Sequence, residues 1–288
     1  MTSTPLVTWL DHTGSTQDHV LSAAAAHPER WPHLSAAATL DQRSGHGRRG
    51  RDWTTPPGTA LAVSVVLRPD VDLEHYTWVT LVAAAATCGE LQARGVPAQV
   101  KWPNDVLAED GRKLCGILAS VLPDQSGLVV GLGLNLDFGP GGSPVPTATS
   151  VADWVPAGAL PEAPELLESV LTALSEGLDA FSLAVREHST AGDGAANGEA
   201  DGAAHGEVDG EHPAVAGVVR QVATLGTEVT VHLPGGSTLA GTARGLGPGG
   251  TLLVQPADHG KMDTAVPGAT WRGELLEVSA ADVVHLRR

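Results

Sequence analysis

The stretch Gln99–Leu136, QVKWPNDVLAEDGRKLCGILASVLPDQSGLVVGLGLNL, decides the fold, because apolar segments alternate in it with short polar interruptions. Each apolar segment is short, rich in branched side chains and bounded by turn-forming residues, as strands are. Strands are therefore predicted over Gln99–Trp102, Lys113–Leu122 and Leu128–Leu136. Pro123–Gly127 contains proline, aspartate, serine and glycine, which favours a hairpin between the last two strands. The stretch predicts a sheet with polar residues at its strand ends.

The flanking segments on both sides add further strands and helices. Additional strands are predicted over Val7–Leu10, Leu34–Leu40 and Thr59–Leu67. Helices are predicted from a cap at Ser15 or Thr16 to Ala26, over Leu73–Arg94, and over Pro164–Ala184, where apolar residues recur at helical spacing. This mixture indicates an α+β domain with a central mixed sheet.

The composition changes sharply in the acidic segment 189–214, STAGDGAANGEADGAAHGEVDGEHPA. It has too few apolar side chains to offset the entropy of ordering, and we predict a disordered insertion. Short strands follow, over Glu228–Leu233, Thr238–Ala243, Thr251–Val254 and Trp271–Val278. They favour a small antiparallel barrel. Three parts are predicted: a catalytic domain over 1–188, the insertion over 189–214 and a β domain over 215–288.

The overall composition points to a soluble cytoplasmic protein. The formal net charge is -16 and the pI is about 5.0, which disfavours non-specific binding to nucleic acid or to acidic membranes. No apolar run approaches the roughly 20 residues that span a bilayer, and the N-terminus has no basic region followed by an apolar one. The two cysteines, Cys88 and Cys115, are expected to be buried, reduced thiols.

The segment Gln42–Trp53, QRSGHGRRGRDW, is a basic loop in an acidic chain. Four arginines fall within nine residues, with glycines between them. Glycine lets backbone N–H groups approach an anion, and arginine offers forked donors for phosphate or carboxylate. The segment predicts a loop that closes over a negatively charged ligand. A solvated basic loop is the alternative.

Lysine is rare, which makes its positions informative. Only Lys101, Lys113 and Lys261 occur among 17 basic residues, which suggests positions where a compact ammonium is needed; chance is the alternative for so small a sample. Lys101 opens the run KWPND, which places a fixed charge, an aromatic ring and polar groups at a strand end. A strand end followed by a Pro-Asn-Asp turn is the alternative.

A glycine inside the next strand indicates a close approach of ligand or backbone, and the strand after it alternates glycine with apolar residues. Gly116 interrupts Arg112–Leu118, and Gly131 and Gly133 alternate along Val130–Leu136. The second pattern lacks the third glycine and the helix of a dinucleotide-binding fingerprint, which disfavours that interpretation.

Together, and in this order, these motifs resemble the biotin protein ligase family. The segments that carry the resemblance are Gly14–Gln17, Gln42, Gly45–Arg51, Lys101–Asp105, Lys113–Leu118 and Gly131–Asn135. The resemblance implies a class II synthetase-like fold, related to lipoate ligases, with a C-terminal SH3-like barrel. Two positions depart from the family pattern: His46 stands where arginine is usual, and Gln17 where asparagine is common. Because the motifs begin at residue 14, the family's DNA-binding extension is expected to be absent.

The resemblance implies ATP-dependent formation of biotinyl-5′-AMP and transfer of biotin to a lysine of a carboxyl carrier domain. Catalysis is assigned to Lys101, Arg48 and Asp105. Biotin binding is assigned to Ser15, Thr16, Gln17, Gln42, His46, Gly47, Arg48, Trp53, Lys101 and Gly116. Adenylate binding is assigned to Arg48, Arg49, Arg51, Lys113, Asn104 and Asn135. Mg²⁺ is expected with ATP, and its ligands stay open.

The implied partner is the carrier domain of acetyl-CoA or propionyl-CoA carboxylase, with no DNA and no membrane involved. Three alternatives remain: a lipoate or octanoate ligase of the same fold, a biotin-sensing repressor, and an inactive ligase homologue. The repressor would need a helix-turn-helix ahead of residue 14. The sequence leaves the oligomeric state, the order of substrate binding and the main acceptor open.

Overall fold

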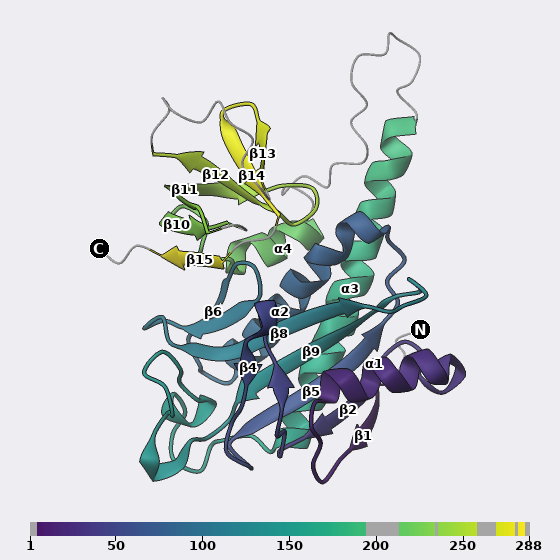
Figure 1. The fold of residues 1–288 in the computed structure, drawn as a ribbon, viewed down its shortest axis with the longest axis vertical. Coiled ribbons are helices and arrows are strands. Elements are labelled where there is room, and N and C mark those ends of the chain that lie inside the picture. The colour runs from purple at the N-terminus through teal and green to yellow at the C-terminus, as the bar shows by residue number, and fades with distance from the viewer. Residues whose placement is uncertain (1–4, 194–212, 234–235, 258–268, 280–281, 286–288) are drawn as a thin grey trace. The chain divides into compact units, whose positions relative to one another are not determined.

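The structure is a computed structural model of the chain, and it describes residues 5–193, 213–233, 236–257, 269–279 and 282–285. Its main sheet has seven strands in the order β1-β2-β5-β9-β8-β7-β6 (Figure 1). In that order the strands are Leu6–Trp9, Ser35–Thr39, Ala60–Leu67, Leu128–Asn135, Lys113–Val121, Asp105–Ala108 and Ala98–Lys101. The β1–β2 pair is parallel, whereas β2–β5, β5–β9, β8–β9 and β7–β8 are antiparallel. The predicted mixed sheet is confirmed.

Helix α1 (Thr16–Ala26) packs against β2, β5 and β9 (Figure 1). The Ser15 hydroxyl caps it by accepting a hydrogen bond from the Asp18 N–H, as the sequence predicts for such a residue. Its buried face places Val20 and Ala24 against Val66 and Val129 of the sheet. This packing fixes the start of α1 over the centre of the sheet.

The chain groups in space into two compact units. The first contains Met1–Asp70, Ala83–Gln99 and Asn104–Leu178, and the second contains Val71–Val82, Val100–Pro103 and Asp179–Arg288. Helices α2 (Tyr76–Ala93) and α3 (Ala163–Asp193) contribute residues to both. Each unit combines segments that are separate in the sequence. The units therefore do not test the domain boundaries at residues 188 and 214, which stay a prediction.

The second unit contains a six-stranded sheet in the order β13-β14-β12-β11-β10-β15. In that order the strands are Ala269–Arg272, Leu275–Val278, Leu252–Pro256, Thr238–Leu246, Glu228–His232 and Asp282–His285. All five pairs are antiparallel. The predicted C-terminal β structure is confirmed, and its closure into a barrel stays a prediction.

Several elements differ from the sequence-based expectation. Helix α4 (Pro213–Gln221) was missed, because its valines favour a strand although Val215, Val218 and Val222 recur at helical spacing and are buried. The predicted strand Trp271–Val278 is a hairpin of β13 and β14, turned at Gly273 with a φ of 60°.

Other differences concern the ends of elements. Strand β7 follows immediately after the Pro103-Asn104 turn, and α2 begins only after a 3-10 turn at Leu73–His75. Helix α3 continues to Asp193, into the predicted insertion, and residues 194–212 lie outside the described residues.

Cys88 and Cys115 are free and buried, as predicted. Burial raises the pKa of each thiol to about 12, so both stay protonated at neutral pH. In the part of the chain that the structure describes, no helix combines the length and apolar character that crossing a membrane requires.

Candidate active site

Three glycines lie next to one another on adjacent strands at the centre of the main sheet, so the sheet surface there carries almost no side chains. Gly116 of β8 pairs with Gly133 of β9, and Gly131 of β9 pairs with Ser64 of β5. Residues two apart in a strand face the same side, so these positions share one face of the sheet. We call Ser64, Gly116, Gly131 and Gly133 the glycine trough. Neighbouring side chains fill it closely, so larger residues would not fit.

One end of the trough is lined by uncharged hydrogen-bonding groups. The Ser64 hydroxyl lies 3.0 Å from both Thr16 Oγ1 and Gln17 Oε1, and it donates to one of them. Gln42 Oε1 accepts from the Thr16 N–H at 2.9 Å and from its hydroxyl at 3.1 Å. A Cβ atom added to Gly131 would lie 2.6 Å from Gln17 Oε1. The predicted residues Thr16, Gln17 and Gln42 therefore converge here.

The other end of the trough carries an aromatic ring and a cation. A Cβ atom added to Gly133 would lie 2.6 to 2.8 Å from atoms of the Trp53 indole, so the ring rests directly on this glycine. Lys113 Nζ lies 5.3 Å from the centre of the same ring, within cation–π range. It also donates to Asp105 Oδ1 at 2.7 Å. A Cβ atom added to Gly116 would lie 2.8 Å from Lys113 Nζ.

Asn104 connects the arginine loop to the sheet. Arg48 Nη1 donates to Asn104 Oδ1 at 3.1 Å, and Asn104 Nδ2 donates to the Ile117 carbonyl at 2.7 Å. Asn135 is buried at the end of β9, where its Nδ2 lies within hydrogen-bond distance of the carbonyls of Lys113 and Thr149. The Arg48–Asn104 contact places Arg48 beside strand β8.

The rest of the arginine loop is more exposed. Two short strands, β3 (Gly45–His46) and β4 (Asp52–Trp53), flank a 3-10 turn over Arg48–Gly50, and Arg49 has a φ of 56°. The Gly47 N–H donates to the Arg51 carbonyl at 2.6 Å. His46 Nε2 lies 2.8 Å from Asp18 Oδ2 of α1, in an exposed pair. His46 therefore faces a carboxylate of its own chain.

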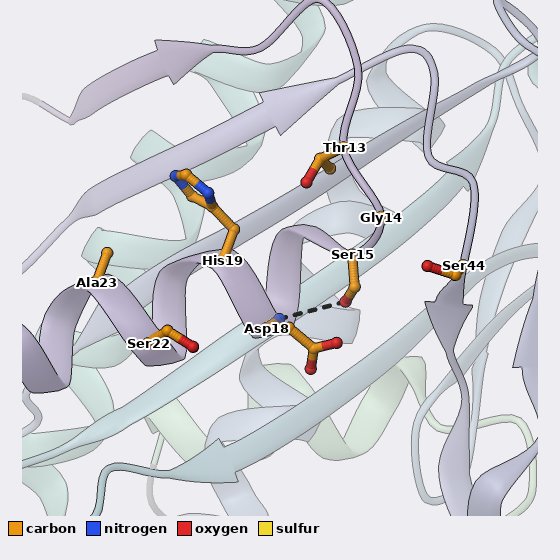
Figure 2. Close-up of a pocket in the computed structure, with 8 residues that line it drawn as sticks. All are labelled: Thr13, Gly14, Ser15, Asp18, His19, Ser22, Ala23 and Ser44. Carbon is orange, nitrogen blue, oxygen red and sulfur yellow. Dashed lines mark hydrogen bonds between the residues drawn. The ribbon is translucent and has the colours of Figure 1, made fainter.

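A surface hollow of about 580 Å³ lies along the first turns of α1 (Figure 2). It is lined by Thr13, Gly14, Ser15, Asp18, His19, Ser22, Ala23 and Ser44. Of these only Ser15 was predicted to bind biotin, and none belongs to the glycine trough. Figure 2 shows Ser15 bonded to the Asp18 backbone, so its hydroxyl serves the helix cap.

Lys101 differs from the other predicted site residues in the unit that contains it. It ends β6 and is half-buried, and it belongs to the second unit, whereas the trough, the loop and Asp105 belong to the first. The structure therefore brings together Thr16, Gln17, Gln42, Trp53, Gly116, Lys113 and Asp105, with Arg48 and Asn104 beside them. Sequence reasoning missed Ser64, which carries no signal of its own, and gave Gly131 and Gly133 no role.

The described residues include no group of three or more histidine, cysteine or acidic side chains able to hold a metal ion. The only carboxylate that the prediction places in the site, Asp105, is paired with Lys113. Mg²⁺ bound to nucleotide phosphates takes most of its ligands from those phosphates and from water, so the described residues would not need to form a cage of side chains around it.

Comparisons with known proteins identify the family of this chain. A model described as the Biotin/lipoate A/B protein ligase family matches residues 12–137. The biotin--[acetyl-CoA-carboxylase] ligase of Mycobacterium tuberculosis is 31% identical over 281 residues, covering 96% of this chain and 87% of that protein. The corresponding ligase of Paracoccus denitrificans is 37% identical over 150 residues, covering 49% of this chain and 59% of that protein.

Among solved structures, the fold resembles biotin protein ligase from Aquifex aeolicus in complex with biotin and ATP. The TM-score is 0.67 at 21% identity, over 98% of this chain and 99% of that one. This likeness concerns the fold, whereas the similarity to the mycobacterial ligase extends along nearly the whole sequence. On that evidence, the chain belongs to the biotin protein ligase family.

Proposed function

We propose that this protein activates biotin with ATP and attaches it to a lysine of the biotin carboxyl carrier domain of an acyl-CoA carboxylase. In the first step the biotin carboxylate attacks the α-phosphorus of ATP, giving biotinyl-5′-AMP and pyrophosphate. In the second, the lysine amine attacks the acyl carbon. An amide forms, AMP leaves and the amine loses a proton.

One observation carries the proposal: the two ends of the glycine trough differ in chemistry. Hydroxyl and amide groups of Thr16, Gln17 and Ser64 line one end, and the Lys113 ammonium stands at the other. Biotin has the same polarity, with a neutral ureido ring at one end and a carboxylate at the other. Lipoate offers a dithiolane instead of the ureido ring, which would leave the hydroxyl and amide groups without a polar ligand.

The residue roles follow from this orientation. Lys113 and Lys101 would stabilise the carboxylate and the charge that develops on the α-phosphoryl oxygens. Arg48 and the neighbouring arginines would hold the adenylate as the loop closes and excludes water. Asp105 keeps Lys113 directed into the site and can release it when the anion arrives. Mg²⁺ would neutralise phosphate charge when bound with ATP.

The partner and the location belong to the same proposal. The acceptor is a carboxylase carrier domain, as in the name of the mycobacterial relative. A cytoplasmic location is supported by the acidic composition and by two buried free thiols. The net charge of -16 supports the expectation that the protein does not bind DNA.

The direct test is the mass of a purified biotin carboxyl carrier domain after incubation with this protein, ATP and biotin. We expect the mass to rise by one biotinyl group, and not to rise without ATP or when the acceptor lysine is replaced. A gain with lipoate but not with biotin would favour the lipoate ligase alternative. No gain with either would contradict ligase activity.

A further inference from the structure

The backbone on both sides of Lys101 is bonded to the segment that follows helix α4. The Val100 carbonyl accepts a hydrogen bond from the Ala223 N–H at 2.8 Å, and Val100 forms a parallel bridge with Val222. On the other side, the Trp102 N–H donates to Thr224 Oγ1 at 3.0 Å. All of these residues belong to the second unit. Lys101 therefore lies between two residues that are fixed to Val222–Thr224.

The side chain of Trp102 adds a third attachment. It is fully buried, and its indole N–H donates to the Gly250 carbonyl at 2.9 Å. Trp78 repeats the contact, since its indole N–H donates to the Pro248 carbonyl at 2.6 Å. The turn Gly247–Gly250 thus accepts hydrogen bonds from two buried tryptophans. We call it the GPGG turn.

The geometry of the GPGG turn depends on glycine. Gly250 has a φ of 71°, which side chains rarely adopt, and a Cβ atom there would lie 3.2 Å from the Trp78 backbone nitrogen. The Gly250 N–H bonds to the Gly247 carbonyl, and the Gly247 N–H bonds to the Thr251 carbonyl. The turn therefore presents its carbonyls to the two indoles in one conformation.

The contact made by Thr224 is the most specific of these, because its side-chain hydroxyl is the acceptor for a backbone N–H. Its residue is fully buried, and its hydroxyl oxygen accepts from the buried Trp102 N–H. Its own carbonyl accepts from the Thr227 hydroxyl at 2.7 Å, which holds the threonine in place. A buried N–H left without an acceptor is costly, so the backbone of Trp102 would move if this hydroxyl were lost.

We propose that Thr224 and the GPGG turn position Lys101 for adenylation, so that Thr224 is a positioning residue of the reaction. The inference rests on the proposed function, in which Lys101 stabilises the phosphoryl transition state. A charge that acts in a transition state must be held in place before the reaction, and small displacements are costly. The C-terminal part of the chain would therefore take part in the first chemical step.

The test separates the two half-reactions in the full-length protein. We expect Thr224→Val to lower kcat for biotin-dependent pyrophosphate release about tenfold or more, with KM for biotin within about twofold of wild type. Transfer of biotin from synthetic biotinyl-5′-AMP to the carrier domain should stay within about twofold, since this step makes no new phosphoryl charge. Thr224→Ser keeps the hydroxyl and should restore kcat.

Thr87→Val is the matched control, because it removes a buried threonine hydroxyl whose hydrogen bond, to the Ala83 carbonyl within helix α2, involves none of the residues that hold Lys101. A loss of kcat equal to that of this control, or an equal loss in both half-reactions, would overturn the inference. If Thr224→Val does not fold, Trp102→Phe removes the bond to Gly250 and must show the same selective fall in kcat. Absence of pyrophosphate release by wild type would instead contradict the proposed function.

Discussion

Two basic segments of this chain are held in opposite ways. In Val100–Pro103, Val100 and Trp102 are fully buried and three hydrogen bonds fix the backbone and indole around Lys101. In Gly45–Trp53 only Gly45 is buried, and most of the arginine loop is exposed. A fixed cation suits a charge that appears only in the transition state, whereas an exposed loop can close after the ligand has bound. The comparison shows that Lys101 lies on a rigid segment, whereas the arginines lie on an exposed loop that can adapt.

The sharpest way to break this comparison is to remove one cation from each segment. Lys101→Ala should lower the rate of pyrophosphate release about a hundred- to a thousandfold, because a preorganised charge is lost. Arg48→Ala should act mainly on retention and speed the release of biotinyl-5′-AMP. Stopped-flow pyrophosphate detection and filter binding measure the two effects. Unchanged melting temperatures would show that both variants are folded, and a near-normal rate in Lys101→Ala would remove that residue from the mechanism.

A second prediction concerns the trough on which the loop tryptophan rests. In Gly133→Ala the new methyl group would overlap the Trp53 indole, so the ring must shift away from β9. We expect Kd for biotin to rise about tenfold, because both the methyl group and the displaced ring change the binding space. Isothermal titration with biotin provides the measurement. Gly141→Ala, at a glycine with open space around it, is the control, and equal affinities for both variants would contradict the assignment of the trough.

The smallest expected effect is at the pair between the loop and helix α1. His46 and Asp18 form an exposed contact, and exposed pairs contribute little. Asp18→Asn should therefore change the release rate of biotinyl-5′-AMP by less than about fivefold. Asp110→Asn breaks an exposed pair with Arg112 on the β7–β8 connection and serves as control. A much larger change in Asp18→Asn alone would show that this contact holds the loop closed.

Sequence reasoning predicted the centre of the main sheet well, because its strands are apolar and clearly bounded. It missed strand β7, since Pro103 and Asn104 indicate a turn and only four residues follow before the strand ends. It missed α4 because valine favours strands, although helical spacing decides the element. At β7 and at α4, the conformational preference of the individual residues was misleading, because burial in the folded protein determined the secondary structure.

The candidate site was predictable as a list of residues but not as an arrangement. The glycine inside β8 indicated a close approach, yet nothing in the sequence showed that Trp53 and Lys113 would occupy the space over it. The contact of Gln17 with Ser64 joins two segments that have no local relation. Thr224 carried no signal at all, because its contact is with the backbone N–H of Trp102, which follows a strand distant in the sequence.

The hydrogen bond between Trp102 and the GPGG turn has a consequence for folding during synthesis. A ribosome delivers the chain from its N-terminus, so Trp78 and Trp102 emerge well before Pro248 and Gly250 have been joined to it. Until then the two indole N–H groups lack the carbonyl acceptors that they have in the folded protein. On the proposed role of Lys101, a chain that ends before Gly250 would lack the support of this lysine and should not form biotinyl-5′-AMP.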